Sequence, residues 1–338
     1  MINIKKLSMV SSAIRNILHS NLLNTQRPIQ VSLAVTNRCN LKCIYCYGSY
    51  GYRKEQDFTT DELKALFRYL KRIGTFQIFL TGGEPLLRKD IAEIVSYLKS
   101  LEFNMGMVTN GLLIPSNIGI LKKLNHIIIS LDGDKSANDA NRGKGTYSGI
   151  MKSVELLRQN NIKFSFKAVF NKNNMCQLDY LLSVAEKYGT TLETIMPYEN
   201  TDDKSQFLSK EQKKALLDKI LAYVKQKRPI EFSYLAHKMS NEVYFKYGEN
   251  IVFGKKSGSY PPCIAGQLYL FIDANGDVYP CNQLMGRFKP KNIRKDGLRN
   301  AIRYARNRPC NLCSTPFLNE KRYLFSLNPK TVLYRLLQ

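Results

Sequence analysis

The most constraining feature of this chain is a group of three cysteines, Cys39, Cys43 and Cys46, within eight residues that follow a strand-like apolar run. Thiolates are soft ligands that suit iron–sulfur clusters or zinc, and the C-x3-C-x2-C spacing lets one tight loop direct all three at a single centre. A structural zinc site normally has four protein ligands. Three cysteines without a fourth nearby therefore predict a metal centre that keeps one position for another ligand.

A second set of cysteines lies near the C-terminus and consists of Cys263, Cys281, Cys310 and Cys313. Asn275-Gly276 between two apolar runs predicts a β-hairpin, because both turn positions tolerate φ > 0. That hairpin would return Cys281 to Cys263. Four thiolates fit either structural zinc or an iron–sulfur cluster, and ligand type alone does not separate the two. Cys176 stands alone and is expected to be a buried thiol.

Length and composition indicate a globular protein in a reducing compartment. The 338 residues, 44% of them hydrophobic, suffice for one large α/β domain and a smaller one. Eight clustered cysteines favour metal ligation over a disulfide framework, so a cytoplasmic location is predicted. Residues 1–24 lack the pattern of a signal peptide, and no run approaches the length of a membrane span.

The net charge of +24 is concentrated at the two ends of the chain. Residues 1–38 carry five Lys or Arg and no acid, and residues 287–338 carry thirteen against two acids. Such a field would attract nucleic acid, anionic lipid or an acidic substrate, and a solvated surface is the alternative. Apolar residues at helical spacing from Leu7 to Leu22 predict an amphipathic helix, which could lie on a membrane or pack on its own protein. The aromatic residues of 234–253 could stack on bases, or form a buried subdomain core.

Strand and helix patterns alternate through the middle of the chain, which predicts a parallel sheet with right-handed crossovers. The expected strands are 29–35, 76–80, 105–108, 126–130, 163–170 and 192–196, and the expected helices begin at Thr59-Thr60 or cover 91–100, 118–124, 149–159, 178–188, 210–225 and 298–307. Ligands of parallel α/β folds collect at the carboxyl edge of the sheet. There, Gly82 and Gly83 would let backbone approach a ligand, and Glu84 would place a carboxylate beside it.

The first cysteine loop resembles the signature of the radical S-adenosylmethionine (SAM) enzymes, whose cysteines hold three irons of a [4Fe–4S] cluster while SAM chelates the fourth. The resemblance implies that Cys39, Cys43 and Cys46 are these ligands. It also implies the residues that contact SAM, which are Tyr45, Gly82, Gly83, Glu84, Ser130, Asp132 and Arg142. Ser130 and Asp132 could instead cap the following segment. Asn138 departs from the family pattern, which commonly has His there.

The second cysteine set resembles the twitch domain, a shortened relative of the SPASM domain. This resemblance implies one auxiliary [4Fe–4S] cluster on Cys263, Cys281, Cys310 and Cys313, with zinc as the alternative. The predicted fold is α/β, a partial (β/α)6 TIM-like barrel followed by a small α+β twitch domain. The predicted segments are an N-terminal helix (1–28), the barrel (29–200), a linking helical segment (201–258), the twitch domain (259–316) and a basic tail (317–338).

The function implied by the resemblance is reductive cleavage of SAM to a 5′-deoxyadenosyl radical that abstracts a substrate hydrogen. An electron donor such as flavodoxin or ferredoxin would be needed. The expected substrate is a peptide or a small metabolite that is oxidised or crosslinked. Two alternatives remain open, an anionic lipid substrate at a membrane surface and a non-catalytic zinc protein that binds nucleic acid. No catalytic acid or base is predicted.

Overall fold

The computed structural model describes residues 26–198 and 204–337. Six strands form a curved sheet in chain order: β1 (Gln30–Ala34), β2 (Gln77–Thr81), β3 (Asn104–Thr109), β4 (His126–Ser130), β5 (Phe164–Val169) and β6 (Leu192–Ile195). Each strand pairs in parallel with the next. The predicted partial (β/α)6 barrel is therefore confirmed.

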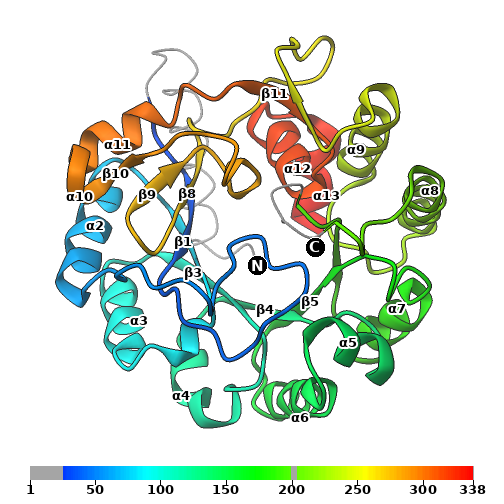
Figure 1. Cartoon of the computed structure of the whole chain (residues 1–338), viewed down its shortest axis with the longest axis horizontal. Helices are drawn as coiled ribbons and strands as arrows, with labels where there is room; N and C mark the ends of the chain where they lie inside the picture. The colour runs from blue at the N-terminus through cyan, green and yellow to red at the C-terminus, as the bar shows by residue number, and fades with distance from the viewer. Residues whose placement is uncertain (1–25, 199–203, 338) are drawn as a thin grey trace.

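The connecting helices lie outside this sheet (Figure 1). They are α2 (Thr60–Arg72), α3 (Ile91–Ser100), α4 (Ile118–Leu121), α5 (Lys135–Arg142), α6 (Thr146–Gln159) and α7 (Leu178–Lys187). The outward-facing apolar residues of the strands and the apolar faces of these helices form one core. The sequence did not predict α5, because its residues KSANDANR show almost no apolar periodicity.

The second half of the chain extends the same sheet beyond β1. The hairpin strands β8 (Tyr269–Ile272) and β9 (Asp277–Tyr279) are antiparallel, β10 (Lys291–Asn292) pairs with β9, and β8 pairs in parallel with β1. Gly276 has a φ of 97°, but Asn275 is not among the residues with positive φ. The predicted hairpin is confirmed, although Asn275 does not adopt the positive φ that it tolerates; its side-chain oxygen accepts a hydrogen bond from Asp277 N at 3.0 Å.

Helices and a two-stranded sheet complete the fold. They are α8 (Lys210–Lys225), α9 (Tyr234–Tyr247), α10 (Ile293–Asp296), α11 (Leu298–Tyr304), α12 (Pro316–Phe325), α13 (Pro329–Leu337) and the antiparallel pair β7 (Ile251–Phe253) and β11 (Cys310–Cys313). Within the described ranges there are three short 3₁₀ turns, η1 (Pro85–Leu87), η2 (Pro115–Asn117) and η3 (Asn282–Leu284). Where the sequence indicated only a basic tail, α12 packs against α9 (Figure 1).

Several expectations bear on the outer parts of the chain. Tyr247, Tyr260 and Tyr323 pack around the buried Met239 and Val243, which favours a buried aromatic core over base stacking for this region. The amphipathic helix expected at 7–22 lies outside the described residues. Among the helices that the structure describes, none is both long and apolar enough to cross a bilayer. The domain boundaries stay predictions.

Candidate active site

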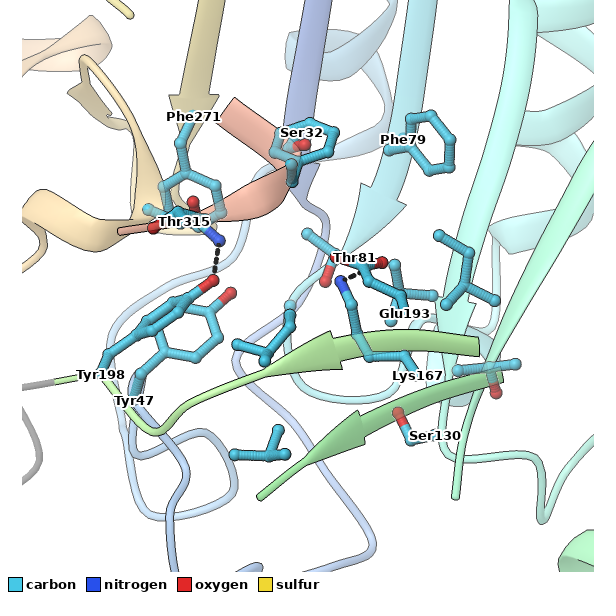
Figure 2. A pocket seen from close by; sticks show the side chains of 18 of the residues that line it. Ser32, Tyr47, Phe79, Thr81, Ser130, Lys167, Glu193, Tyr198, Phe271 and Thr315 are labelled. Carbon is cyan, nitrogen blue, oxygen red and sulfur yellow. Dashed lines mark hydrogen bonds and ion pairs between the residues drawn. The ribbon is translucent and has the colours of Figure 1, made fainter. Parts of the chain in front are cut away.

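A cavity of about 560 Å³ occupies the inside of the barrel next to the first cysteine loop. Alternate residues of the strands face it, because successive side chains of a strand point to opposite faces of the sheet. Figure 2 shows Ser32, Phe79, Ser130, Lys167 and Phe271, each of which lines the cavity from a different strand. The cavity is thus built by the strands themselves, with the cysteine loop closing one side.

The thiol-bearing residues Cys39, Cys43 and Cys46 all line this cavity. A turn joins Cys46 N to Cys43 O at 3.1 Å, and Leu41 N donates to Cys39 Sγ at 3.4 Å. Burial raises the pKa of the Cys39 thiol, and it raises the pKa of Cys43 to about 11; neighbouring thiols add to both effects. Thiols that disfavour one another's ionisation become thiolates together only around a cation. The donor set therefore fits a metal centre.

The thiols of both sets suit an iron–sulfur cluster by ligand type. Within residues 26–198 and 204–337, no three His, Cys, Asp or Glu side chains are placed so that they could hold one metal ion. An iron–sulfur cluster has no such requirement, because each cysteine binds a different iron.

The loop that carries the three cysteines is seated on Gly82 and Gly83. A Cβ on Gly82 would lie 2.6 Å from Thr36 O, and one on Gly83 would lie 2.0 Å from Arg38 O. Gly83 N donates to Thr36 O at 2.9 Å, and Glu84 N donates to Arg38 O at 2.9 Å. The two glycines thus allow backbone to approach backbone, which places the cysteine loop at the end of β2.

Replacing Gly83 with alanine is expected to displace the cysteine loop and remove roughly half of the iron, that of the first set, while the second set keeps its cluster. The measurement is the iron and sulfide content of anaerobically purified protein. Gly119→Ala is the control, because no atom lies within 4 Å of the added Cβ. Full iron content in Gly83→Ala would contradict this assignment.

Glu84 does not line the cavity but lies behind its wall. It is 0% exposed, and its carboxylate accepts hydrogen bonds from Thr109 Oγ1 at 2.9 Å, Asn110 N at 2.8 Å and Leu86 N at 3.1 Å. Burial raises its pKa to about 7, although these hydrogen bonds oppose the shift. Glu84 therefore acts on the cavity through Asn110, which lines it.

The stability of the protein is expected to fall as the pH rises from about 4.5 to about 7, by up to about 3 kcal/mol from Glu84 alone. The unfolded chain loses this proton near the ordinary carboxyl pKa, whereas the folded protein keeps it to higher pH, so ionisation penalises only the folded state. Chemical denaturation across this window measures the slope. Glu84→Gln should flatten the slope, and an unchanged slope would contradict the prediction.

Asp132 is the centre of a buried polar network. Its side chain is 0% exposed, and its Oδ2 lies 2.8 Å from Arg142 Nε. Asp132 also accepts hydrogen bonds from the Tyr45 hydroxyl and, at 3.0 Å, from Val169 N. The Asp132 carboxylate is among the causes that raise the pKa of Arg142 above its ordinary value, despite desolvation. Tyr45 and Arg142 line the cavity, so Asp132 orients two wall residues.

The sequence prediction missed an ion pair inside the cavity. Lys167 Nζ lies 3.1 Å from Glu193 Oε2, and Figure 2 shows both side chains in the cavity. Burial raises the pKa of Glu193, which is 5% exposed, while Lys167 opposes the shift. Lys167 stands beside Ser130 in the sheet register. The only signal in the sequence was one charged residue within each of the strands FSFKAV and LETI.

The second cysteine set lies outside the cavity lining, in an apolar cluster of its own. Cys263, Cys281, Cys310 and Cys313 are each at most 6% exposed and pack with residues such as Leu268 and Leu284. Burial raises the pKa of the Cys281 thiol well above its ordinary value, and the three other thiols add to this. The four thiols are therefore grouped, and the hairpin returns Cys281 to Cys263 as predicted.

Two rings and one amide connect the cysteine sets. Tyr47, next to Cys46 in the chain, has its ring centroid 4.8 Å from that of Tyr198, and Figure 2 shows the two rings against each other. The Tyr198 hydroxyl accepts a hydrogen bond from Asn282 Nδ2 at 2.8 Å. Asn282 follows Cys281 in the chain. One wall of the cavity thus links both cysteine loops.

Five of the seven residues predicted to contact SAM line the cavity: Tyr45, Gly82, Gly83, Ser130 and Arg142. The other two lie behind the wall, and all seven contacts stay predictions. Asn138, which departs from the family pattern, is buried, and its Nδ2 donates to Thr146 Oγ1 at 2.9 Å. The prediction for Cys176 is wrong, because this thiol is exposed in the turn before α7.

Two parts of the chain match described protein families. Residues 33–184 match the radical SAM superfamily, and residues 263–321 match an iron–sulfur cluster-binding domain named SPASM. The first match contains the three-cysteine loop and the barrel up to α7, and the second contains all four cysteines of the other set.

Individual proteins show more distant similarity. The chain is 29% identical to mycofactocin maturase MftC of Mycolicibacterium smegmatis, over 80% of this chain and 68% of MftC. It is 32% identical to Fe-coproporphyrin III synthase of Methanosarcina barkeri, over 45% of this chain and 40% of the synthase. The structure of Streptococcus suis SuiB bound to precursor peptide SuiA has a TM-score of 0.66 at 18% identity, over 87% of this chain and 68% of SuiB, which shows a common fold.

Proposed function

The chain belongs to the radical SAM superfamily and has a C-terminal iron–sulfur cluster-binding domain, and on this premise we propose that it is a maturase that modifies a peptide side chain. A [4Fe–4S] cluster with bound SAM supplies the chemistry, a 5′-deoxyadenosyl radical that takes a hydrogen atom from the substrate. The protein supplies binding and orientation in the cavity described above.

The proposed ligands follow from the two thiol groups. Cys39, Cys43 and Cys46 would hold the SAM-binding cluster at the cavity wall, and Cys263, Cys281, Cys310 and Cys313 would hold an auxiliary cluster behind it. Ser130 and Arg142 face the same cavity and would contact SAM beside the first cluster. SAM and substrate would therefore share one space.

The size and lining of the cavity are the main support for a peptide substrate. A drug-sized ligand usually occupies a pocket of about 300–1,000 Å³, so a 560 Å³ cavity that already takes SAM leaves room for a group the size of a side chain. Lys167 and Glu193 would face that group. The name of MftC as a maturase and the fold shared with a peptide-bound SuiB support the same substrate class.

An iron tetrapyrrole is the second candidate substrate. Similarity to Fe-coproporphyrin III synthase motivates it, and three cationic side chains that line the cavity, Arg142, Lys167 and Lys321, would suit its carboxylates. A macrocycle needs more room beside SAM than a side chain does, which favours the peptide.

The test is anaerobic incubation with SAM, a reductant and a peptide encoded beside this protein. We expect 5′-deoxyadenosine in a fixed ratio to modified peptide, with a mass loss located on one side chain by tandem mass spectrometry. Cys43→Ala should produce neither product. Modification of iron coproporphyrin III instead of any neighbouring peptide would overturn the peptide assignment, and absence of 5′-deoxyadenosine in every case would overturn the radical chemistry.

We also propose flavodoxin or ferredoxin as the electron donor. The net charge of +24 would attract an acidic protein and accelerate its association. Turnover driven by such a donor should therefore slow as ionic strength rises, whereas turnover driven by dithionite should change much less. Equal salt dependence with both reductants would contradict an electrostatic docking site.

The described residues provide no observation that favours the lipid or nucleic-acid alternatives. The amphipathic helix that motivated the lipid lies outside them, and the aromatic residues near α9 are used in packing. The nucleic-acid alternative assumed zinc at the second cysteine set, whereas residues 263–321 match an iron–sulfur cluster-binding domain.

A further inference from the structure

Two arginines reach the buried second cysteine set. Arg322 of α12 is 1% exposed, donates to Pro261 O at 3.3 Å and to Asn311 O, and its guanidinium also contacts the Cys263 thiol. Arg308, just before β11, donates to Cys263 O at 2.8 Å. Both positive charges therefore lie at the edge of the apolar cluster that contains the four thiols.

Neither charge is balanced by a carboxylate. Within residues 26–198 and 204–337 no Asp or Glu forms an ion pair with Arg308 or Arg322, and the Nε atom of each is buried without a hydrogen-bond partner. Arg142 is different, because Asp132 neutralises it. Burying a guanidinium without a neighbouring anion costs roughly several kcal/mol of folding free energy. The fold thus retains two cations whose counter-charge is not a side-chain carboxylate.

The four cysteines supply that counter-charge once they hold a cluster. Four thiolates carry more negative charge than the iron–sulfur core cancels, so the whole group is an anion. One-electron reduction makes it more negative still, which an apolar surrounding opposes and nearby cations favour. Net charge and hydrogen bonds to sulfur are among the factors that set the potential of such clusters.

We propose that Arg308 and Arg322 are positioning residues that balance the charge of the auxiliary cluster and raise its reduction potential, so that this site accepts an electron instead of serving as a purely structural centre. The proposal rests on the auxiliary cluster of the proposed function, but not on the identity of the substrate. A role limited to clamping the carbonyls of Pro261 and Asn311 is the competing explanation for Arg322.

The test measures the potential of the auxiliary cluster alone. Cys39, Cys43 and Cys46 are replaced by alanine in the full chain so that only the second set contributes an electron paramagnetic resonance signal. The protein is titrated with dithionite, which donates one electron to the oxidised cluster. Arg308→Met, Arg322→Met and Arg322→Lys are compared with this parent, and Arg303→Met is the control, because it removes an equal charge from an exposed position on α11.

Arg308→Met and Arg322→Met should each lower the ratio of reduced to oxidised cluster at a fixed potential by tenfold or more, a shift of about 59 mV for one electron. Arg322→Lys should stay near the parent, and Arg303→Met should match it. If the Arg322→Met protein loses its iron, the reduction potential of the Arg308→Met protein alone tests the proposal. An iron-loaded Arg308→Met with an unchanged potential, or a second set that purifies with zinc, would overturn the proposal.

Discussion

Replacing Asp132 with alanine is expected to destabilise the folded protein by about 3–5 kcal/mol, because the change leaves Arg142 buried without its counter-charge. The side chains of Asp132 and Arg142 are 0% and 5% exposed, so water cannot replace the lost carboxylate. The hydroxyl of Tyr45 and the amide of Val169 lose their acceptor as well. The wall of the cavity beside the first cysteine loop should therefore loosen.

Urea denaturation of the anaerobic protein measures the loss of stability. Asp218→Ala is the matched control, because Asp218 also pairs with a cation, Lys214, but its side chain is 50% exposed; an exposed pair contributes less than about 1 kcal/mol. The double variant Asp132→Ala with Arg142→Met should be more stable than the sum of the single effects predicts, because it removes both charges. Equal losses at Asp132 and Asp218 would contradict the network described above.

Replacing Glu193 with glutamine is expected to lower formation of the modified product by about 10²–10⁴-fold, the range typical for loss of a general base. A substrate that gives up a hydrogen atom and then an electron must also release a proton. Glu193 is a buried carboxylate in the cavity, and its amide replacement keeps the shape but cannot accept that proton. SAM binding should remain, because the residues predicted to contact SAM are unchanged.

The pH profile separates this role from a structural one. Glu193 must be ionised to act, and burial raises its pKa, so the rate should rise with pH through a value above the ordinary carboxyl range. Lys167→Met removes the charge that opposes this shift and should move the rise to still higher pH. Glu193→Gln should abolish the rise. Glu155→Gln is the control, because Glu155 lies outside the cavity lining and its side chain is 39% exposed. A Glu193→Gln enzyme with the parent rate and profile would refute a general-base role for Glu193.

The barrel could be predicted because its signals are local. Six apolar strand segments, each followed by a polar or glycine turn and an amphipathic helix, predict a parallel sheet that is covered by helices. α5 escaped prediction because its burial comes from polar contacts such as those of Asn138, which a hydrophobic pattern does not register. The location of Lys167 and Glu193 in the cavity was not predicted, because one charged residue in a short strand does not reveal which face of the strand points inward.

The site was predictable as a set of positions but not as a set of roles. Gly82 and Gly83 were expected to let backbone approach a ligand, and both line the cavity; the structure adds that their missing side chains seat the cysteine loop. Glu84 and Asp132 were predicted to contact SAM, and these contacts stay predictions; the structure adds that both are buried behind the cavity wall, where they bind Asn110, Tyr45 and Arg142. A sequence motif records that a residue type is needed at a position, but the same carboxylate can serve a cofactor or the residues around it.

By itself the sequence determined the fold class, the two cysteine sets and the chemistry that they support, because strand and helix periodicity and the spacing of metal ligands are encoded over short stretches of chain. Only the tertiary structure decided which charges face the cavity and which stand behind it. It also placed Arg322 against the thiol of Cys263 and Arg308 against the backbone carbonyl of the same residue. The physical reason is that burial and electrostatic pairing depend on distances between residues far apart in the chain, and those distances are set only when the whole chain has folded.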